Sequence, residues 1–301
     1  MFSSTKGAKK YEGSDVILHS GTFKVVYDSL WSILSIYPAM TEFGTENVMI
    51  GDPFHDDKEE SGYEGIFAVG EGLYVVRESI QSEEDEFHAV VEEVSLREAD
   101  GEYDLLRACP TDLSFDGDSK GFEGAVGFMA SDDGGIYMLG LCEGNYCKEG
   151  KKGKERGNGR VVVMKRNSGG VGADCSWETV EILEIPKTAD FQDYSAISVS
   201  DSGKVAVTSQ EDSMMWVGHL KGVVDEDTIT SVKDIGFEGE GELFNFPREQ
   251  DGCKHIFCNI EGVHWIGEDQ IVAVSDKMKS NGKQPNECFS NDQSIHVFVL
   301  P

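Results

Sequence analysis

Positive charge is scarce in this chain of 301 residues. Lysine and arginine together number 26 against 56 aspartates and glutamates, which gives a net charge of −30 at neutral pH. Nucleic acids and anionic membrane surfaces require a cationic face on the protein that binds them, so we expect neither as a partner. The acidic balance leaves two interpretations open, a surface that binds cations or charge that keeps the protein soluble.

Long apolar runs are also missing. No stretch approaches the roughly 18 apolar residues that a membrane-spanning helix needs, and residues 1–10 lack the apolar core of a signal peptide. No Asn-x-Ser/Thr sequon occurs. We therefore expect a cytoplasmic protein, or a secreted one if the N-terminus is the product of processing.

Several signatures of catalysis and metal binding are absent. The chain has no Gly-x-Ser-x-Gly elbow and no Walker-type loop, so nucleophilic acyl transfer and nucleotide binding lack support. Four residues separate Cys142 from Cys147 and Cys253 from Cys258, unlike the two-residue spacing of common zinc sites. This spacing allows small disulfide loops, but we expect most of the seven cysteines to be free, buried thiols.

The chain does contain a repeated phrase: an aromatic or aliphatic residue, Glu-Gly, a short apolar run, a turn, and a second apolar run that ends at an acidic residue. The copies begin at Tyr11-Glu12-Gly13, Tyr63-Glu64-Gly65, Phe122-Glu123-Gly124, Tyr194-Ser195-Ala196 and Ile260-Glu261-Gly262. Their second runs end at Asp28, Glu78, Glu143, Glu211 and Asp276. Self-similarity of this kind predicts a repeated supersecondary unit.

Between the phrases, short runs of β-branched and aromatic residues alternate with Gly, Asp and Ser turns, which is typical of β-strands. Each unit offers four strands and the last offers three. In the first unit the expected second strand is Thr22–Tyr27, and in the fourth unit the expected outer strand is Ile229–Ile235. Repeated four-stranded units predict an all-β, five-bladed β-propeller in one domain, with six blades as the alternative. The expected blades are 11–62, 63–121, 122–193, 194–259 and 260–301, and residues 1–10 are expected to supply the missing strand of the last blade.

In a propeller blade, the first strand lines the central channel and the second runs antiparallel beside it, so the start of one and the end of the other share a face. We therefore expect nine carboxylates at one mouth of the channel: Glu12, Glu64, Glu123, Glu261, Asp28, Glu78, Glu143, Glu211 and Asp276. Clustered like charges must be protonated or bind cations, and several oxygen ligands suit Ca²⁺. The alternative is structural, with Gly permitting a tight turn and Glu accepting its backbone N–H groups.

Two basic loops are expected at the same face, Lys148–Arg160 and Lys277–Lys283. Together with a bound cation, they would suit a phosphorylated or carboxylated ligand; the alternative is that they are simply solvated. The candidate ligand contacts are Lys151, Lys152, Lys154, Lys277 and Lys279. On the first strands, His19 and His264 are candidate general bases, or else satisfied core or channel residues.

The phrase resembles that of phytase-like or esterase-like propeller domains and of the strictosidine-synthase and paraoxonase group. Two copies carry the resemblance: Tyr63-Glu64-Gly65-Ile66 followed by Leu73–Glu78, and Ile260-Glu261-Gly262-Val263 followed by Val272–Asp276. The resemblance implies a Ca²⁺ ion in the channel and hydrolysis of esters or phosphoesters. That group is commonly six-bladed, whereas five phrases are present here.

Two functions follow as hypotheses. The first is a Ca²⁺-binding, metal-assisted hydrolase of an anionic ester or phosphoester, with Glu12, Glu64, Glu123 and Glu261 holding the ion. The second is a non-catalytic propeller that binds a protein or a glycan on one face. The sequence does not indicate an oligomeric state.

Overall fold

The computed structural model of the protein describes most of the chain. The described residues are 11–38, 47–51, 60–82, 84–118, 120–168, 175–225, 227–248, 255–276 and 293–301. The expectation that residues 1–10 complete the last blade concerns residues outside these ranges.

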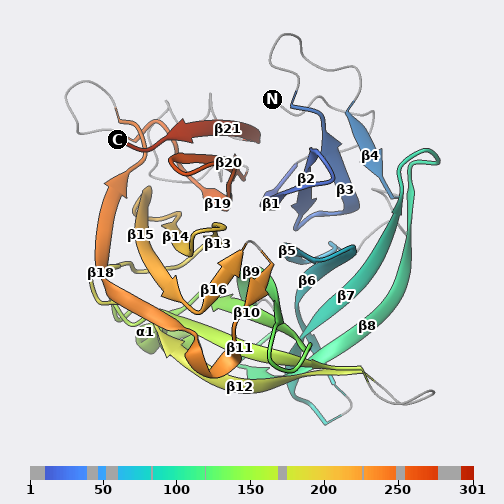
Figure 1. Cartoon of the computed structure of the whole chain (residues 1–301), viewed down its shortest axis with the longest axis horizontal. Helices are drawn as coiled ribbons and strands as arrows, with labels where there is room; N and C mark the ends of the chain where they lie inside the picture. Colours follow the sequence, from blue (N-terminus) through green and yellow to red (C-terminus); the bar gives the residue numbers. More distant parts are fainter. Residues whose placement is uncertain are drawn as a thin grey trace.

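The described chain consists almost entirely of antiparallel β-strands, which confirms the all-β prediction (Figure 1). The strands form five meanders, in which each strand pairs with the next. The first contains β1 (Gly13–His19), β2 (Thr22–Tyr27), β3 (Leu30–Ile36) and β4 (Val48–Ile50), and the second β5 (Tyr63–Val69), β6 (Gly72–Gln81), β7 (Phe87–Arg97) and β8 (Glu102–Phe115). The third contains β9 (Phe122–Ala130), β10 (Ile136–Cys142), β11 (Arg160–Asn167) and β12 (Ser176–Glu184). The fourth contains β13 (Ala196–Val199), β14 (Lys204–Ser209), β15 (Met214–Lys221) and β18 (Gly236–Asn245), and the fifth β19 (Ile260–Trp265), β20 (Gln270–Ser275) and β21 (Ser294–Val299).

The first strands of the five meanders surround a common centre (Figure 1). Strand β1 contacts β5, β5 contacts β9, β9 contacts β13, β13 contacts β19, and β19 contacts β1. The second strands are apolar and almost fully enclosed; β2, with the sequence TFKVVY, is buried at every position. A short, continuous apolar run between turns is typical of a strand that is covered on both faces. The fold is therefore of the β-propeller type.

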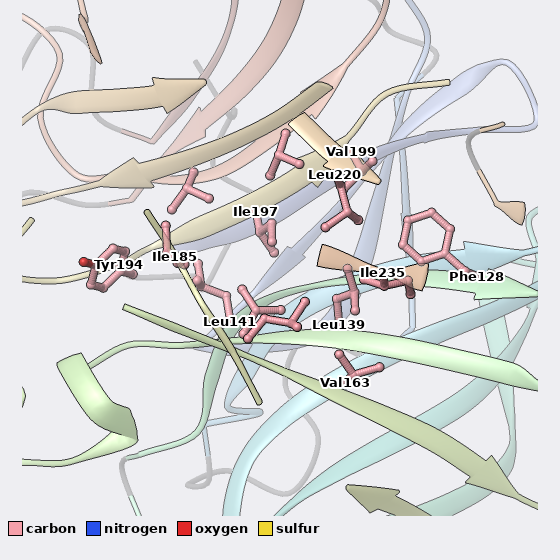
Figure 2. Packing of buried hydrophobic residues seen from close by; sticks show 14 of the residues in the cluster. Phe128, Leu139, Leu141, Val163, Ile185, Tyr194, Ile197, Val199, Leu220 and Ile235 are labelled. Carbon is pink, nitrogen blue, oxygen red and sulfur yellow. The ribbon is translucent and has the colours of Figure 1, made fainter. Parts of the chain in front are cut away.

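The apolar core lies between neighbouring sheets. Figure 2 shows the largest cluster, in which Phe128, Leu139 and Val163 of the third sheet face Ile197 and Leu220 of the fourth. All five side chains are at most 3% exposed. Burial of this kind fixes the position of each sheet against the next, and hence the position of the strand ends at the two mouths of the channel.

The fourth sheet differs from the sequence prediction at its outer strand. Residues 229–235 do not form one strand: β17 (Thr228–Ile229) pairs with β9 of the third sheet, and residues Val232–Asp234 form a 3-10 helix, η3. Strand β17 also pairs with β16 (Val223–Asp225), and the outer strand is β18 instead. Ile229 and Ile235 both belong to the largest core cluster, in which Figure 2 labels Ile235, and this burial explains the apolar pattern of the segment. Strand β18 is largely exposed and has few apolar residues to mark it.

The cysteines are a second correction. Cys109 and Cys175 form one disulfide, Cys142 and Cys147 form another, and Cys258 is also disulfide-bonded. The expectation of mostly free thiols is therefore wrong, and the small loop allowed by the Cys142/Cys147 spacing is present. The Cys109–Cys175 bond connects the outermost strands of the second and third sheets, where β12 pairs with β8.

In the part of the chain that the structure describes, helical structure is limited to single turns, which include η2 (Asn145–Cys147) and α1 (Gly150–Gly153) between β10 and β11. Within the described ranges, no helix has the length and apolar character needed to cross a membrane.

Candidate cation site at the strand-start mouth

A β-bulge lies at the Glu-Gly step of the repeated phrase. In the second sheet, Tyr63 pairs with Arg77 and Gly65 with Val76, so that Glu64 is the extra residue. A bulge leaves its extra residue unpaired and redirects the chain locally. By the same pairing, the equivalent positions are occupied by Glu123 in β9 and Glu261 in β19.

The first sheet has the same bulge, but not where the phrase predicts it. Gly13 pairs with Tyr27 and Asp15 with Val26, so the extra residue is Ser14. Ser14 precedes Asp28 by the same number of residues that separate Glu64 from Glu78, a spacing that could have revealed the correct alignment. The phrase Tyr11-Glu12-Gly13 is therefore two residues out of register, and Glu12 is not the equivalent of Glu64.

The fourth sheet has no carboxylate at the bulge position and none directly after its second strand. Ala196 pairs with Thr208, which places Ser195 at the bulge position and Gln210 directly after the end of β14. Ser195 Oγ donates to the carbonyl of Ile260 in the fifth sheet. Glu211, one residue further, is exposed. The ring of carboxylates is therefore interrupted here.

Carboxylates from the first and second sheets converge in a tight group. One oxygen each of Asp28, Glu64 and Glu78 lies within 4.8 Å of the other two. Glu64 is buried, with 8% exposure, and within the described ranges its carboxylate makes no hydrogen bond or ion pair. We call these three residues the acidic cluster.

Glutamates of neighbouring sheets surround the acidic cluster. Burial is the largest cause that raises the pKa of the Glu64 carboxyl well above its ordinary value, followed by the charges of Glu123 and Asp28. Burial, and then Asp28, raises the pKa of Glu78 to about 7. Glu261 of the fifth sheet also raises the pKa of Glu64, so four sheets contribute charge. The mouth therefore holds more negative charge than its surroundings neutralise.

Two further predicted ligands, Glu12 and Asp276, lie at the strand ends. The backbone N–H of Asp28 donates to the carbonyl of Glu12, and Glu12 is half-buried. Asp276 is buried, and its N–H donates to the carbonyl of Asn259. Both residues occupy the predicted face, and neither belongs to the acidic cluster.

Lys120 is a cation that the sequence analysis missed. Its Nζ lies 2.6 Å from a carboxylate oxygen of Glu143, and its charge lowers the pKa of Glu78 and of Glu123 against the other effects that raise them. Its carbonyl accepts hydrogen bonds from Ser79, in the strand segment directly after Glu78. Lys120 thus neutralises part of the negative charge of the mouth.

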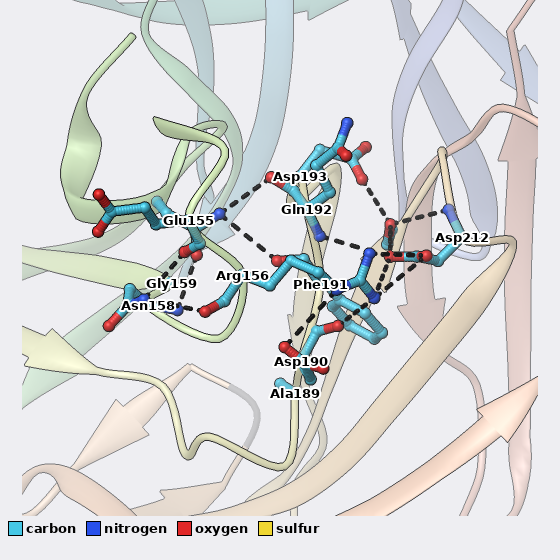
Figure 3. Close-up of polar contacts among 12 residues, drawn as sticks. Glu155, Arg156, Asn158, Gly159, Ala189, Asp190, Phe191, Gln192, Asp193 and Asp212 are labelled. Carbon is cyan, nitrogen blue, oxygen red and sulfur yellow. Dashed lines mark hydrogen bonds and ion pairs between the residues drawn. The ribbon is translucent and has the colours of Figure 1, made fainter. Parts of the chain in front are cut away.

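The basic loop Lys148–Arg160 emerges at this face, but most of its described cations contact acidic neighbours. Lys152 Nζ lies 2.9 Å from Glu155 and 3.7 Å from the centre of the Tyr146 ring. Arg156 pairs with Asp212 at 3.1 Å in the network drawn in Figure 3. Lys151 is exposed on α1. The other predicted contacts, Lys277 and Lys279, lie outside the described residues.

A groove lies beside the acidic cluster. Lys120, Lys148 and Lys154 line it together with Glu143 and Glu211 and with Asp193, another residue that the sequence analysis missed. Burial raises the pKa of Asp193 to about 6, although Ser209 Oγ donates to its carboxylate. The groove therefore presents positive and negative charges side by side.

The two predicted bases lie in the channel away from the acidic cluster. His19 is five residues along β1 from Ser14, or about 16 Å at the rise of a β-strand. Half-buried His264 also lines the channel, and burial lowers its pKa to about 4. Asp15, between the channel and the mouth, accepts hydrogen bonds from the N–H groups of Val16 and Ile66. Neither histidine is brought to the acidic cluster.

Comparisons with known proteins give similarity of arrangement only. No protein-family model matches the chain, and no curated protein is a detectable sequence relative. Among solved structures, it resembles the PQQ-bound aldose sugar dehydrogenase of Streptomyces coelicolor, with 12% identity, a TM-score of 0.48, and coverage of 96% of this chain and 95% of that one. It also resembles a GH32 β-fructofuranosidase of Bombyx mori, with 9% identity, a TM-score of 0.45, and coverage of 96% of this chain and 59% of that one. A third similar structure is a catalytically inactive virginiamycin B lyase of Staphylococcus aureus, with 7% identity, a TM-score of 0.37, and coverage of 98% of this chain and 86% of that one.

Proposed function

We propose that the chain is a five-bladed β-propeller whose acidic mouth binds a divalent cation, with Ca²⁺ as the preferred ion. The blade count rests on the contacts of the five first strands, which lead from β1 through β5, β9, β13 and β19 back to β1. An experimental structure with a sixth meander would contradict this count.

The cation is proposed mainly because of Glu64. A buried carboxylate without a hydrogen-bond partner is costly unless it is protonated or meets a cation. Two further carboxylates lie within 4.8 Å of it. Ca²⁺ binds oxygens at about 2.3–2.6 Å, so oxygens on opposite sides of one ion are about 5 Å apart. The separation within the acidic cluster therefore suits three ligands of a single Ca²⁺ ion.

The test is thermal unfolding in EDTA, followed by a Ca²⁺ titration at constant ionic strength. A ligand at 100 times its dissociation constant adds about 2.7 kcal/mol to the free energy of unfolding, which corresponds to on the order of 5 °C for a chain of this size. We expect Glu64→Gln to abolish this rise and to stabilise the protein in EDTA, because glutamine needs neither a proton nor a cation to be buried. The matched control is Glu211→Gln, in an exposed residue, which should keep the response.

A response shared by every salt would indicate screened surface charge and would contradict the proposal. A saturable response to Ca²⁺ that survives Glu64→Gln would place the ion elsewhere.

A second candidate function is hydrolysis of an anionic ester or phosphoester. The groove beside the acidic cluster supports it, since Lys148 and Lys154 line this groove next to Glu143. A non-catalytic role, in which the ion stabilises the propeller for a protein or glycan partner, has the better support, because neither histidine lies near the acidic cluster. Phosphoester turnover that requires Ca²⁺ and is lost in both Glu64→Gln and Lys154→Ala would favour the enzyme.

A further inference from the structure

The short disulfide between Cys142 and Cys147 lies directly beside the carboxylates of the mouth. Cys142 is the last residue of β10 and directly precedes Glu143. It pairs with Phe122, which directly precedes Glu123. The bond therefore closes a short loop next to Glu123 and Glu143, the two glutamates that the third sheet contributes to the mouth.

The segment closed by this disulfide has an unfavourable backbone. Tyr146 and Cys147 have φ angles of 60° and 54°, in the left-handed region, which is unfavourable for residues other than glycine. Such conformations persist where surrounding structure enforces them. Two residues on, the backbone carbonyl of Glu149 accepts the N–H of Gly153 in α1, so this segment leads directly into the basic loop.

A second anchor holds the same loop from the other side. Asn145 is fully buried, and its side-chain amide donates to the carbonyls of Gly153 and Gln192. Its Oδ1 accepts the N–H of Asn158. Loss of the disulfide would therefore loosen the segment next to Glu143 without detaching the whole loop from the fold.

The two cysteines of this disulfide differ in exposure. Cys142 is 1% exposed, whereas Cys147 is half-buried. Both line a small pocket together with Lys120 and Lys148, whose ammonium groups pair with Glu143 and Asp116.

We propose that the Cys142–Cys147 bond is a redox-sensitive latch that holds Glu143 and the basic loop against the mouth, so that its reduction weakens cation binding. The inference rests on the proposed function, because the affected site is the same. The reductant is a dithiol: one thiolate attacks Sγ of Cys147, the S–S bond breaks, and its electron pair leaves on Sγ of Cys142. The second thiolate then attacks the sulfur bound to Cys147 and releases that cysteine as a thiolate. Two electrons pass to the protein, the reductant leaves as a disulfide, and both cysteines take protons from water.

The experiment compares the full-length native protein with two double variants, Cys142→Ser/Cys147→Ser and Cys109→Ser/Cys175→Ser. The second pair is the matched control, because it removes a disulfide at the outer rim, away from the mouth. Ca²⁺ affinity and amide hydrogen exchange are measured for all three, and for the native protein with and without a dithiol. We expect the dissociation constant for Ca²⁺ to rise at least about fivefold in the first variant and in reduced native protein, and to stay within about twofold in the control. Exchange should accelerate in residues 143–149.

Equal Ca²⁺ affinity in all three proteins would overturn the coupling. A native protein that binds no Ca²⁺ would instead contradict the proposed function, and hydrogen exchange would then decide the latch alone. If residues 143–149 exchange at the same rate with and without the bond, the latch is wrong as well.

Discussion

At the scale of single residues, the chemistry of the mouth depends on which carboxylates the bulges enclose. Glu64 is buried between sheets, whereas Glu211 has the same chemistry in an exposed position. The desolvation cost of a charge falls steeply with exposure. Glu64 therefore has to be neutralised in the folded protein, while Glu211 can stay ionised at little cost.

Lys120 competes with a bound cation for this negative charge. We expect Lys120→Gln to raise the affinity for Ca²⁺ by about fivefold, equivalent to on the order of 1 kcal/mol, since one positive charge near the ion is removed and Glu143 is released. In EDTA the same variant should unfold at a lower temperature, because repulsion among the glutamates is no longer offset. Calorimetric titration and thermal unfolding measure the two effects; Lys151→Gln, in an exposed residue on α1, is the control. Weaker Ca²⁺ binding in Lys120→Gln would mean that this lysine organises the site.

At the scale of elements, the repeated Gly after the bulge position is explained by the approach of neighbouring first strands. A Cβ atom on Gly262 would lie 2.6 Å from Cα of Asp15, and one on Gly65 would lie 3.3 Å from the backbone N of Ala125. Neither backbone can withdraw without opening the ring. The structural interpretation of the glycines therefore holds whatever the glutamates bind.

The close approach gives a direct test. We expect Gly262→Ala to destabilise the protein by about 2 kcal/mol or more, because the added methyl overlaps backbone and not a flexible side chain. Gly236→Ala, at the start of β18, is the matched control, since nothing lies within 4 Å of its Cβ position. Chemical denaturation measures both. Equal stability of the two variants would show that the first strands can separate without cost.

Strand positions could be predicted from the sequence wherever apolar runs are bounded by turns, as in Thr22–Tyr27, which is confirmed residue for residue as β2. Two features were not predicted, because the sequence pattern and the structure differ at these places. The outer strand β18 carries exposed glutamates and glycines, so burial leaves no alternation to recognise. The phrase at Glu12 matches the others in letters, yet hydrogen-bond pairing sets the register and selects Ser14. Lys120 and Asp193 belong to no phrase at all, and only the fold brings them to the mouth.

At the scale of the whole molecule, the ring makes stability depend on pH through the carboxylates that it brings together. The pKa of Glu78 rises from 4.5 to about 7 in the folded protein, mainly by burial. The folded state therefore binds more protons than the unfolded state between these values, so this contribution to stability is lost as pH rises through the window. His264, with its pKa lowered from 6.5 to about 4, acts in the opposite sense and loses stability as pH falls.

A comparison of variants separates the two contributions, since His264 is common to both proteins. In EDTA we expect Glu78→Gln to unfold close to the native protein at about pH 4.5 and at a clearly higher temperature above about pH 7, because glutamine cannot acquire the costly charge. With saturating Ca²⁺ the order should reverse near neutral pH, since the native carboxylate then binds an ion that glutamine binds poorly. The control is Glu181→Gln, in an exposed residue on the outermost strand β12, which should follow the native protein at every pH. A temperature difference between Glu78→Gln and the native protein that does not vary with pH would mean that the pKa of Glu78 is the same in the folded and the unfolded protein. The mouth would then accept the charge of Glu78 without proton or metal.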